Sequence, residues 1–109
     1  MASLTPTLLY IGNGNGNVYT VGNANGTYSI IKAINVCNTG TSGKSFSLNL
    51  VAAGENLGSQ NSIVSNVALS AGNVFSYDTS IVMPAGSFLQ ITQADTSLTF
   101  TISGVEYVV

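Results

Sequence analysis

Charge is the scarcest property of this 109-residue chain, which has two lysines, four acidic residues, no arginine and no histidine. Nucleic acids and anionic membranes recruit clusters of Lys and Arg, so we expect neither as a partner. A Ser-His-Asp or Cys-His catalytic arrangement cannot form without histidine. The four carboxylates show no spacing typical of a metal site or a glycosidase pair. We therefore expect no enzyme activity, no cofactor and no metal, with calcium at Asp78 or Asp95 as the remaining alternative.

Cysteine and long apolar runs are equally scarce. Cys37 is the only cysteine, so the chain cannot form an internal disulfide. Its place in a run of strand-forming residues predicts a small buried side chain. No stretch approaches the roughly 20 apolar residues that a membrane-spanning helix needs. Residues 1–11 lack the basic leader and the full apolar block of a signal peptide, so we expect a protein that is made in a cytosol and stays whole.

What the chain has in abundance is uncharged. Hydrophobic residues make up 45% of it, and Asn, Ser, Thr and Gly must supply most of the polar surface. A chain of this size folds as one domain and exposes roughly 5,700 Å². Soluble designs usually place charge on roughly a quarter to a third of surface positions. This surface is typical of a structural subunit that works packed against its neighbours.

Alternation of apolar and polar residues with a period of two recurs along the chain and predicts β-strands. Glycine-rich and asparagine-rich turns separate these segments. The segments are 28–37, 45–52, 62–69, 74–78, 81–83, 88–93, 98–103 and 105–109. About seven to eight short strands with regular turns predict an all-β fold, an antiparallel β-sandwich with a jelly-roll-like arrangement.

Two strand details are specific enough to test. Both faces of the 28–37 segment are largely apolar, which predicts a central strand covered on both sides. Strict alternation places Ile30, Lys32 and Ile34 on one of those faces and Ile31 on the other. Gly104 interrupts the last apolar run, which predicts a bulge or bend there.

The N-terminal segment differs from the rest of the chain because it is rich in Gly and Asn. We divide the chain into residues 1–26, an N-terminal arm or edge segment, and residues 27–109, the β-sandwich domain. Repeated glycine is entropically costly to order, which favours an arm, whereas two turns flanking a short strand favour an edge. The candidate partner contacts are Leu8, Leu9, Tyr10, Ile11, Tyr19 and Lys44.

Five tyrosines offer a second functional hypothesis. Tyr10, Tyr19, Tyr28, Tyr77 and Tyr107 would form an aromatic platform for sugars if they were exposed together. Aromatic residues on alternating strands are more often core or interface anchors. A carbohydrate-binding adhesin module is therefore the alternative from a different class.

Four stretches from residue 28 onward resemble a group of small β-sandwich virion proteins of tailed bacteriophages, of the head cement or decoration type. They are Tyr28–Ile34, Val36–Gly40, Leu69–Gly72 and Thr101–Glu106. This resemblance implies a non-enzymatic bacteriophage protein that stabilises the shell of the major capsid protein. It implies a homo-oligomer, dimer or trimer, located in the virion and assembled in the host cytoplasm. A tail, neck or fibre-associated subunit of the same fold is the alternative.

Two features depart from that group. Many of its members have an acidic Gly-Asp turn where this chain has Gly86-Ser87, so a metal or contact role at that turn is in doubt. The Gly/Asn-rich N-terminal segment also has no match in the group.

Overall fold

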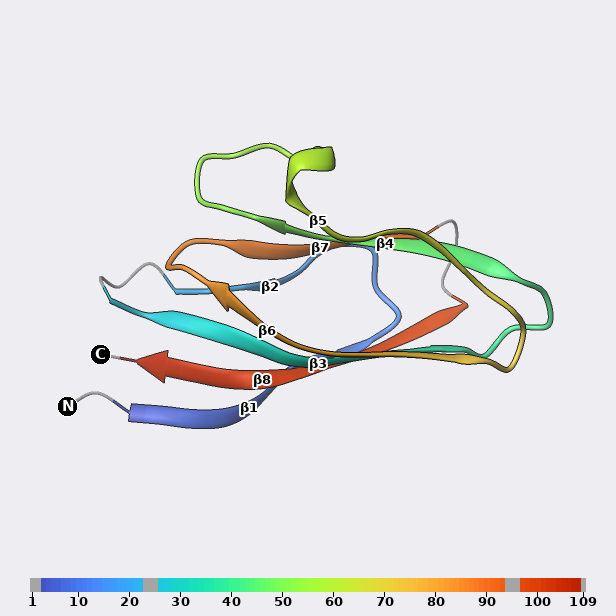
Figure 1. Ribbon diagram of the computed structural model, residues 1–109, viewed down its shortest axis with the longest axis horizontal. Helices are drawn as coiled ribbons and strands as arrows, with labels where there is room; N and C mark the ends of the chain where they lie inside the picture. Colours follow the sequence, from blue (N-terminus) through green and yellow to red (C-terminus); the bar gives the residue numbers. More distant parts are fainter. Residues whose placement is uncertain (1–2, 23–25, 94–96, 109) are drawn as a thin grey trace.

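The computed structural model describes residues 3–22, 26–93 and 97–108, which form two antiparallel sheets packed face to face (Figure 1). Sheet A has the strand order β1-β8-β3-β6, and sheet B has the order β2-β7-β4-β5. The elements are β1 (Ser3–Gly12), β2 (Gly16–Thr20), β3 (Tyr28–Asn38), β4 (Lys44–Val51), the short 3-10 helix η1 (Ser59–Asn61), β5 (Ser62–Leu69), β6 (Val74–Met83), β7 (Phe88–Gln93) and β8 (Leu98–Val108).

The strand order is that of a jelly roll. The chain crosses between the two sheets at every connection except the one from β4 to β5, and every pairing between neighbouring strands is antiparallel. Eight strands in two sheets, arranged as two Greek keys, define this architecture. The prediction of an all-β antiparallel sandwich with a jelly-roll-like arrangement is confirmed.

The described part of the N-terminal segment contributes an edge strand to each sheet. Strand β1 pairs with β8 from Ser3 opposite Val108 to Gly12 opposite Phe100, and β2 pairs with β7. The turn between β1 and β2 ends at Gly16, whose φ of 86° lies in the left-handed region that favours glycine. The glycines of this segment therefore allow the chain to pass from one sheet to the other.

A bulge in β3 changes which residues face the core. The register between β3 and both of its neighbours shifts between Ile31 and Ala33, so Lys32 is an extra residue. Ile31 and Ile34 are consequently both fully buried, although strict alternation predicted opposite faces for them. The prediction that β3 is covered on both sides is also wrong, because none of the described strands packs over its outer face.

Gly104 lies inside β8, which runs without interruption through that position. The bulge predicted there is instead in the neighbouring strand at Lys32. A Cβ atom on residue 104 would collide with the backbone carbonyl oxygen of Ile30. Glycine is required here because β3 approaches β8 closely beside its bulge.

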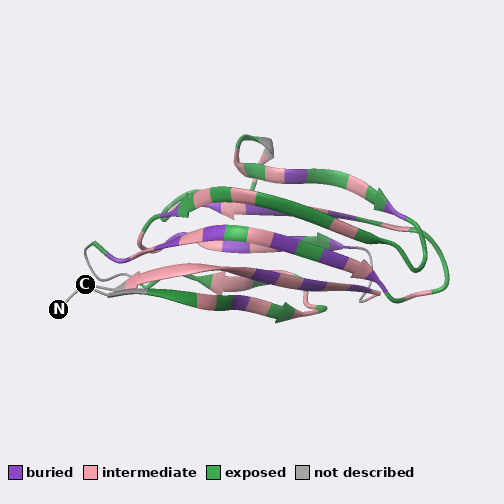
Figure 2. Cartoon of the chain, turned by 60° about the horizontal axis from the view of Figure 1, so that its bottom comes forward, coloured by how far each residue is buried: buried purple, intermediate pink, exposed green. Residues whose placement is uncertain are grey.

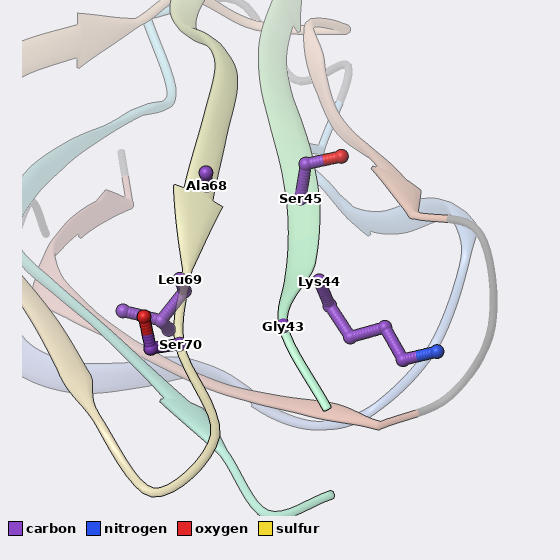
Figure 3. A pocket seen from close by; sticks show the side chains of 6 residues that line it. All are labelled: Gly43, Lys44, Ser45, Ala68, Leu69 and Ser70. Carbon is purple, nitrogen blue, oxygen red and sulfur yellow. The ribbon is translucent and has the colours of Figure 1, made fainter. Parts of the chain in front are cut away.

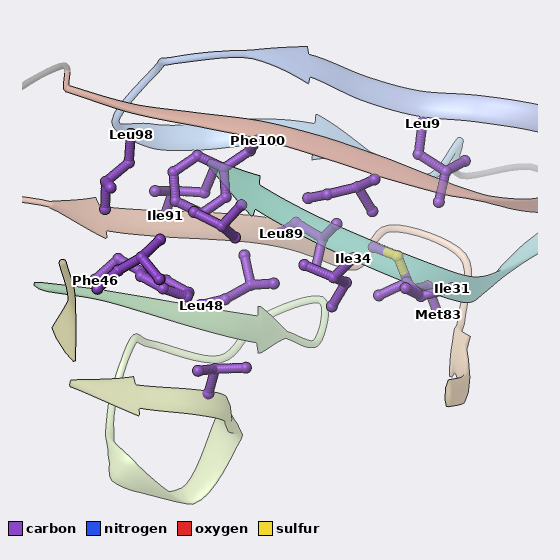
Figure 4. Packing of buried hydrophobic residues seen from close by; sticks show 14 of the residues in the cluster. Leu9, Ile31, Ile34, Phe46, Leu48, Met83, Leu89, Ile91, Leu98 and Phe100 are labelled. Atoms are coloured by element: carbon purple, nitrogen blue, oxygen red, sulfur yellow. The ribbon is translucent and has the colours of Figure 1, made fainter. Parts of the chain in front are cut away.

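The core fills the space between the two sheets (Figure 4). Phe46 of sheet B makes edge-to-face contacts with Phe75 and Phe100 of sheet A, with ring centroids 5.5 and 5.4 Å apart. Buried and less buried residues alternate along most strands, as in any two-layer sandwich (Figure 2). Each sheet therefore has one face in the core and one outer face.

Candidate interaction surfaces

The outer face of sheet A combines one apolar row with polar residues, among them Ser103, Asp78 and Asn35. One row of directly paired residues crosses all four strands, from Pro6 in β1 through Val105 in β8 and Ile30 in β3 to Val82 in β6. Residues beside this row in sequence, such as Ser29 and Ile31, are fully buried, so the row itself points away from the core. We call this surface the apolar face.

Further apolar side chains extend the apolar face on both sides of that row. Tyr28 and Tyr107 stack on each other with ring centroids 4.8 Å apart. Six large hydrophobic residues of the described chain are exposed, and four of them lie on this face. They are Leu8 (55% exposed), Ile11 (63%), Val74 (59%) and Val82 (56%). This concentration on one of two available faces indicates a surface that needs a partner.

The outer face of sheet B has the opposite character. Its corresponding row runs from Asn17 in β2 through Gln90 in β7 and Asn49 in β4 to Ser62 in β5. Every side chain in that row is polar and uncharged. The two broad surfaces of the sandwich therefore differ in chemistry, and sheet B can face water without a partner.

Two of the three exposed charged residues of the described chain lie on the apolar face. Lys32 and Asp78 are exposed on the β3–β6 side of the apolar face, and Lys32 Nζ donates a hydrogen bond to Ser80 Oγ at 2.6 Å. Glu55 is exposed in the loop between β4 and β5. Asp95 lies outside the described residues. The apolar face thus carries one positive and one negative side chain.

The predicted contact residues of β1 are distributed between surface and core. Leu8 and Ile11 project from the apolar face. Leu9 is only 7% exposed and packs in the core, because a bulge between Leu8 and Tyr10 turns it inward. Tyr10 is half-buried, and its hydroxyl oxygen accepts a hydrogen bond from the backbone N–H of Gly14 at 2.8 Å. In this fold Leu9 and Tyr10 stabilise the sandwich.

Tyr19 belongs to a polar cluster between the sheets. Its hydroxyl hydrogen bonds with Ser29 Oγ at 2.8 Å and donates to Glu106 Oε2 at 3.2 Å. Burial raises the pKa of the Tyr19 phenol above its ordinary value, the hydrogen bond with Ser29 lowers it, and the Glu106 carboxylate raises it further. Tyr19 therefore links the edge strand β2 to sheet A.

Lys44 begins β4 beside a shallow hollow of about 460 Å³ between the ends of β4 and β5 (Figure 3). The hollow is lined by Gly43, Ser45, Ala68, Leu69 and Ser70 as well as Lys44. The Lys44 side chain extends away from Leu69 and Ser70 (Figure 3). Small residues and backbone dominate this lining, so it offers little chemistry for a specific ligand.

The described tyrosines do not gather on one platform. Tyr28 and Tyr107 stack on the apolar face, whereas Tyr10 and Tyr19 are bonded inside the sandwich. Tyr77 is 39% exposed and lines a groove of about 570 Å³ between β6 and the loop that precedes β5. Glu55 and Gln60 line the same groove. An aromatic ring beside a carboxylate and an amide is chemistry that suits a hydroxylated ligand.

The described chain has no assembled metal site. No group of three His, Cys, Asp or Glu side chains in residues 3–22, 26–93 and 97–108 is placed to hold an ion. Likewise, the described residues include no helix long and apolar enough to span a membrane.

Comparison with known proteins relates this chain to others by fold alone. No family model matches the sequence, and no curated protein matches it. Two solved virus structures share the fold, a chain of the T13 IBDV viral particle (TM-score 0.56, 11% identity) and one of infectious bursal disease virus strain Gx (TM-score 0.52, 12% identity). Each match covers 98% of this chain and 30% or 32% of the viral chain. What this chain shares with them is the antiparallel β-sandwich fold, and it spans about a third of each viral chain.

A third solved structure is less similar. It is the N-terminal part of xylanase 10B from Clostridium thermocellum, with CBM22-1 and GH10 modules complexed with xylohexaose. The match has a TM-score of 0.44 and 17% identity, and it covers 99% of this chain and 24% of the other. We draw no argument from similarity at this level.

Sequence reasoning found the strands of the apolar face but not the face itself. Ile30 was predicted to be covered, and Pro6, Val82 and Val105 were not singled out. A signal was present, since Ile30, Val82 and Val105 all lie in predicted strands. Which face each of them occupies depends on the register and on the bulge at Lys32.

Proposed function

We propose that this chain is a non-enzymatic cement or decoration protein of a bacteriophage capsid. It binds and stabilises the shell formed by the major capsid protein, acts as a homo-oligomer, and is assembled into the virion in the host cytoplasm. The observation that carries this proposal is that two lysines and four acidic residues are the only charged side chains in 109 residues. A surface made mostly of apolar, hydroxyl and amide groups is suited to packing against another protein.

The scarcity of charge supports binding over a large area. Charged groups are depleted in the buried centres of protein interfaces, because removing their hydration is costly. In the described chain only Lys32, Glu55 and Asp78 are exposed charged residues. Most of the remaining surface consists of apolar, hydroxyl and amide groups, which can be desolvated at lower cost when they pack against a shell.

The fold supports the same proposal. Jelly rolls are frequent in viral capsid domains, and the two virus chains described above share this one. A fold by itself does not determine function, so the argument depends on the surface. The lack of histidine in the whole sequence supports a non-enzymatic role.

The test is the copy number of this chain in purified particles, measured by quantitative mass spectrometry against the major shell protein. A cement protein follows the shell symmetry, so we expect about one copy per shell subunit, or about one per three. A ratio below about one in thirty would instead indicate a tail, neck or fibre-associated subunit, because those structures have few copies per particle. Absence from particles would reject every virion role.

The groove beside Tyr77 favours carbohydrate binding as a second candidate function. An exposed ring can stack on a sugar while Glu55 and Gln60 bond to its hydroxyl groups. A glycan array should then give signals that Tyr77→Ala abolishes and Tyr28→Ala, outside the groove, retains. An array without signals would remove this candidate.

A further inference from the structure

We infer that the apolar face of sheet A binds the same face of a second copy of this chain, forming a two-fold symmetric dimer. This inference deepens the homo-oligomeric part of the proposed function by naming the self-binding surface. Capsid binding then uses other parts of the sandwich.

The shape of the face suits a copy of itself. A sheet packs well on another sheet about 10 Å away, with side chains of both faces interdigitating. The apolar face is formed by four neighbouring strands, and one row near its end (Pro6, Val105, Ile30 and Val82) is apolar across the full width. A two-fold contact lets this row pack against the same row of the other copy.

The area is sufficient for a dimer. Four strands spaced by about 4.8 Å span about 19 Å, and ten residues at about 3.3 Å each extend about 33 Å. The whole outer face of sheet A, with its apolar and polar residues together, therefore measures about 600 Å² per copy, or about 1,200 Å² over two copies. This reaches the lower limit of stable specific interfaces, which bury about 1,200 to 2,000 Å² in total.

The charge on the face favours a copy of itself over a charged partner. Lys32 and Asp78 contribute one charge of each sign, so the formal charge of the face is zero although the chain carries −2. Two identical faces can then meet without net repulsion, and Lys32 of each copy can approach Asp78 of the other. A partner with a strong charge of one sign would have no net electrostatic attraction to the apolar face.

Sedimentation velocity of the purified full-length chain tests the inference without any capsid. We expect a concentration-dependent equilibrium between 11.2 kDa monomers and dimers of twice that mass. Val82→Lys places two unpaired positive charges in the dimer interface and should raise the dissociation constant at least about tenfold. Leu8→Lys, at the opposite edge of the face, should act in the same direction.

Leu57→Lys is the matched control. Leu57 is 47% exposed, close to the 56% of Val82, but it lies in the loop between β4 and β5. The Leu57→Lys substitution should leave the dissociation constant of the dimer unchanged. Circular dichroism and the melting temperature of each variant confirm that it is folded, because lysine at exposed positions usually changes stability by less than about 0.5 kcal/mol.

Several outcomes would overturn the inference. A wild-type chain that stays monomeric at every concentration measured would do so. A dimer that Val82→Lys and Leu8→Lys leave intact would place the interface elsewhere, and a trimer would exclude face-to-face pairing. If the wild-type chain is monomeric and Val82→Lys or Leu8→Lys abolishes its binding to particles, the capsid shell is the partner that covers the apolar face. The copy number in particles tests the proposed function separately.

Discussion

The side chain of Asn38 ties the two sheets of the sandwich together at Leu69. Its Nδ2 donates a hydrogen bond of 2.9 Å to the Leu69 carbonyl oxygen, which joins the end of β3 in sheet A to the end of β5 in sheet B. Nδ2 also donates to the Ser42 carbonyl oxygen, and Oδ1 accepts from the Gly40 N–H. Asn38 is fully buried, so each of these backbone groups depends on it.

We expect Asn38→Ala to lower the free energy of unfolding by about 1–3 kcal/mol, because it leaves the buried carbonyl oxygen of Leu69 without this partner and removes the partly buried bonds to Gly40 and Ser42. Urea denaturation measures the change. Asn35→Ala is the control, since Asn35 is exposed on the same strand and should lose no more than about 0.5 kcal/mol. Equal losses in the two variants would show that the buried bonds of Asn38 contribute little.

Gly104→Ala should destabilise the sandwich by about 1–3 kcal/mol, because the added Cβ meets the carbonyl oxygen of Ile30 and the two strands must separate. Gly43→Ala is matched to it, since a Cβ there would meet only the Leu69 carbonyl oxygen at an ordinary 3.9 Å. Thermal unfolding followed by circular dichroism compares the two. A Gly104→Ala melting temperature equal to that of Gly43→Ala would contradict the close approach of β3 to β8.

Tyr19→Phe removes the hydroxyl that bonds to Ser29 and Glu106. We expect it to cost about 1–2 kcal/mol at neutral pH, because Ser29 is fully buried and would keep an unpaired hydroxyl. Urea denaturation at pH 7 gives this value. An unchanged midpoint there would mean that water replaces the lost hydroxyl.

The pH dependence of stability also reports on Tyr19. Burial raises the pKa of its phenol above the ordinary value of 10.0, so the folded state favours the protonated form. This contribution is complete below about pH 10 and is lost as the pH rises through the folded pKa. Denaturation between pH 8 and pH 11.5 should therefore show a smaller alkaline loss of stability in Tyr19→Phe than in the wild type. Identical profiles would exclude a shifted pKa.

Deletion of residues 1–12 should prevent stable folding. It removes β1, so the backbone of β8 loses its partner strand along one edge and the core loses Leu9. Expression, solubility and the melting temperature of the truncated chain test this. A truncated chain that folds like the wild type but no longer enters particles would show that β1 acts as a binding arm.

The alternation of residues along the chain was sufficient to predict the strands from residue 28 onward and the antiparallel sandwich. This is because a two-layer sheet needs one apolar face per strand, and Phe46 and Leu48 alternate with serines. The pattern failed in β3, where an extra residue at Lys32 changes the face of every residue that follows it. Local sequence does not reveal a bulge, because the bulge is defined by the pairing with β6 and β8.

For the candidate interaction surfaces, too, the sequence predicted one part and the tertiary structure decided the other. Composition alone indicated a protein of very low charge that works against neighbours, because two lysines and four acidic residues cannot charge a surface of this size. Only the tertiary structure decided that Leu9 is buried beside the exposed Leu8, and that Pro6, Val105, Ile30 and Val82 form one row. These residues are far apart in sequence, and the register of four strands is a property of the folded sheet.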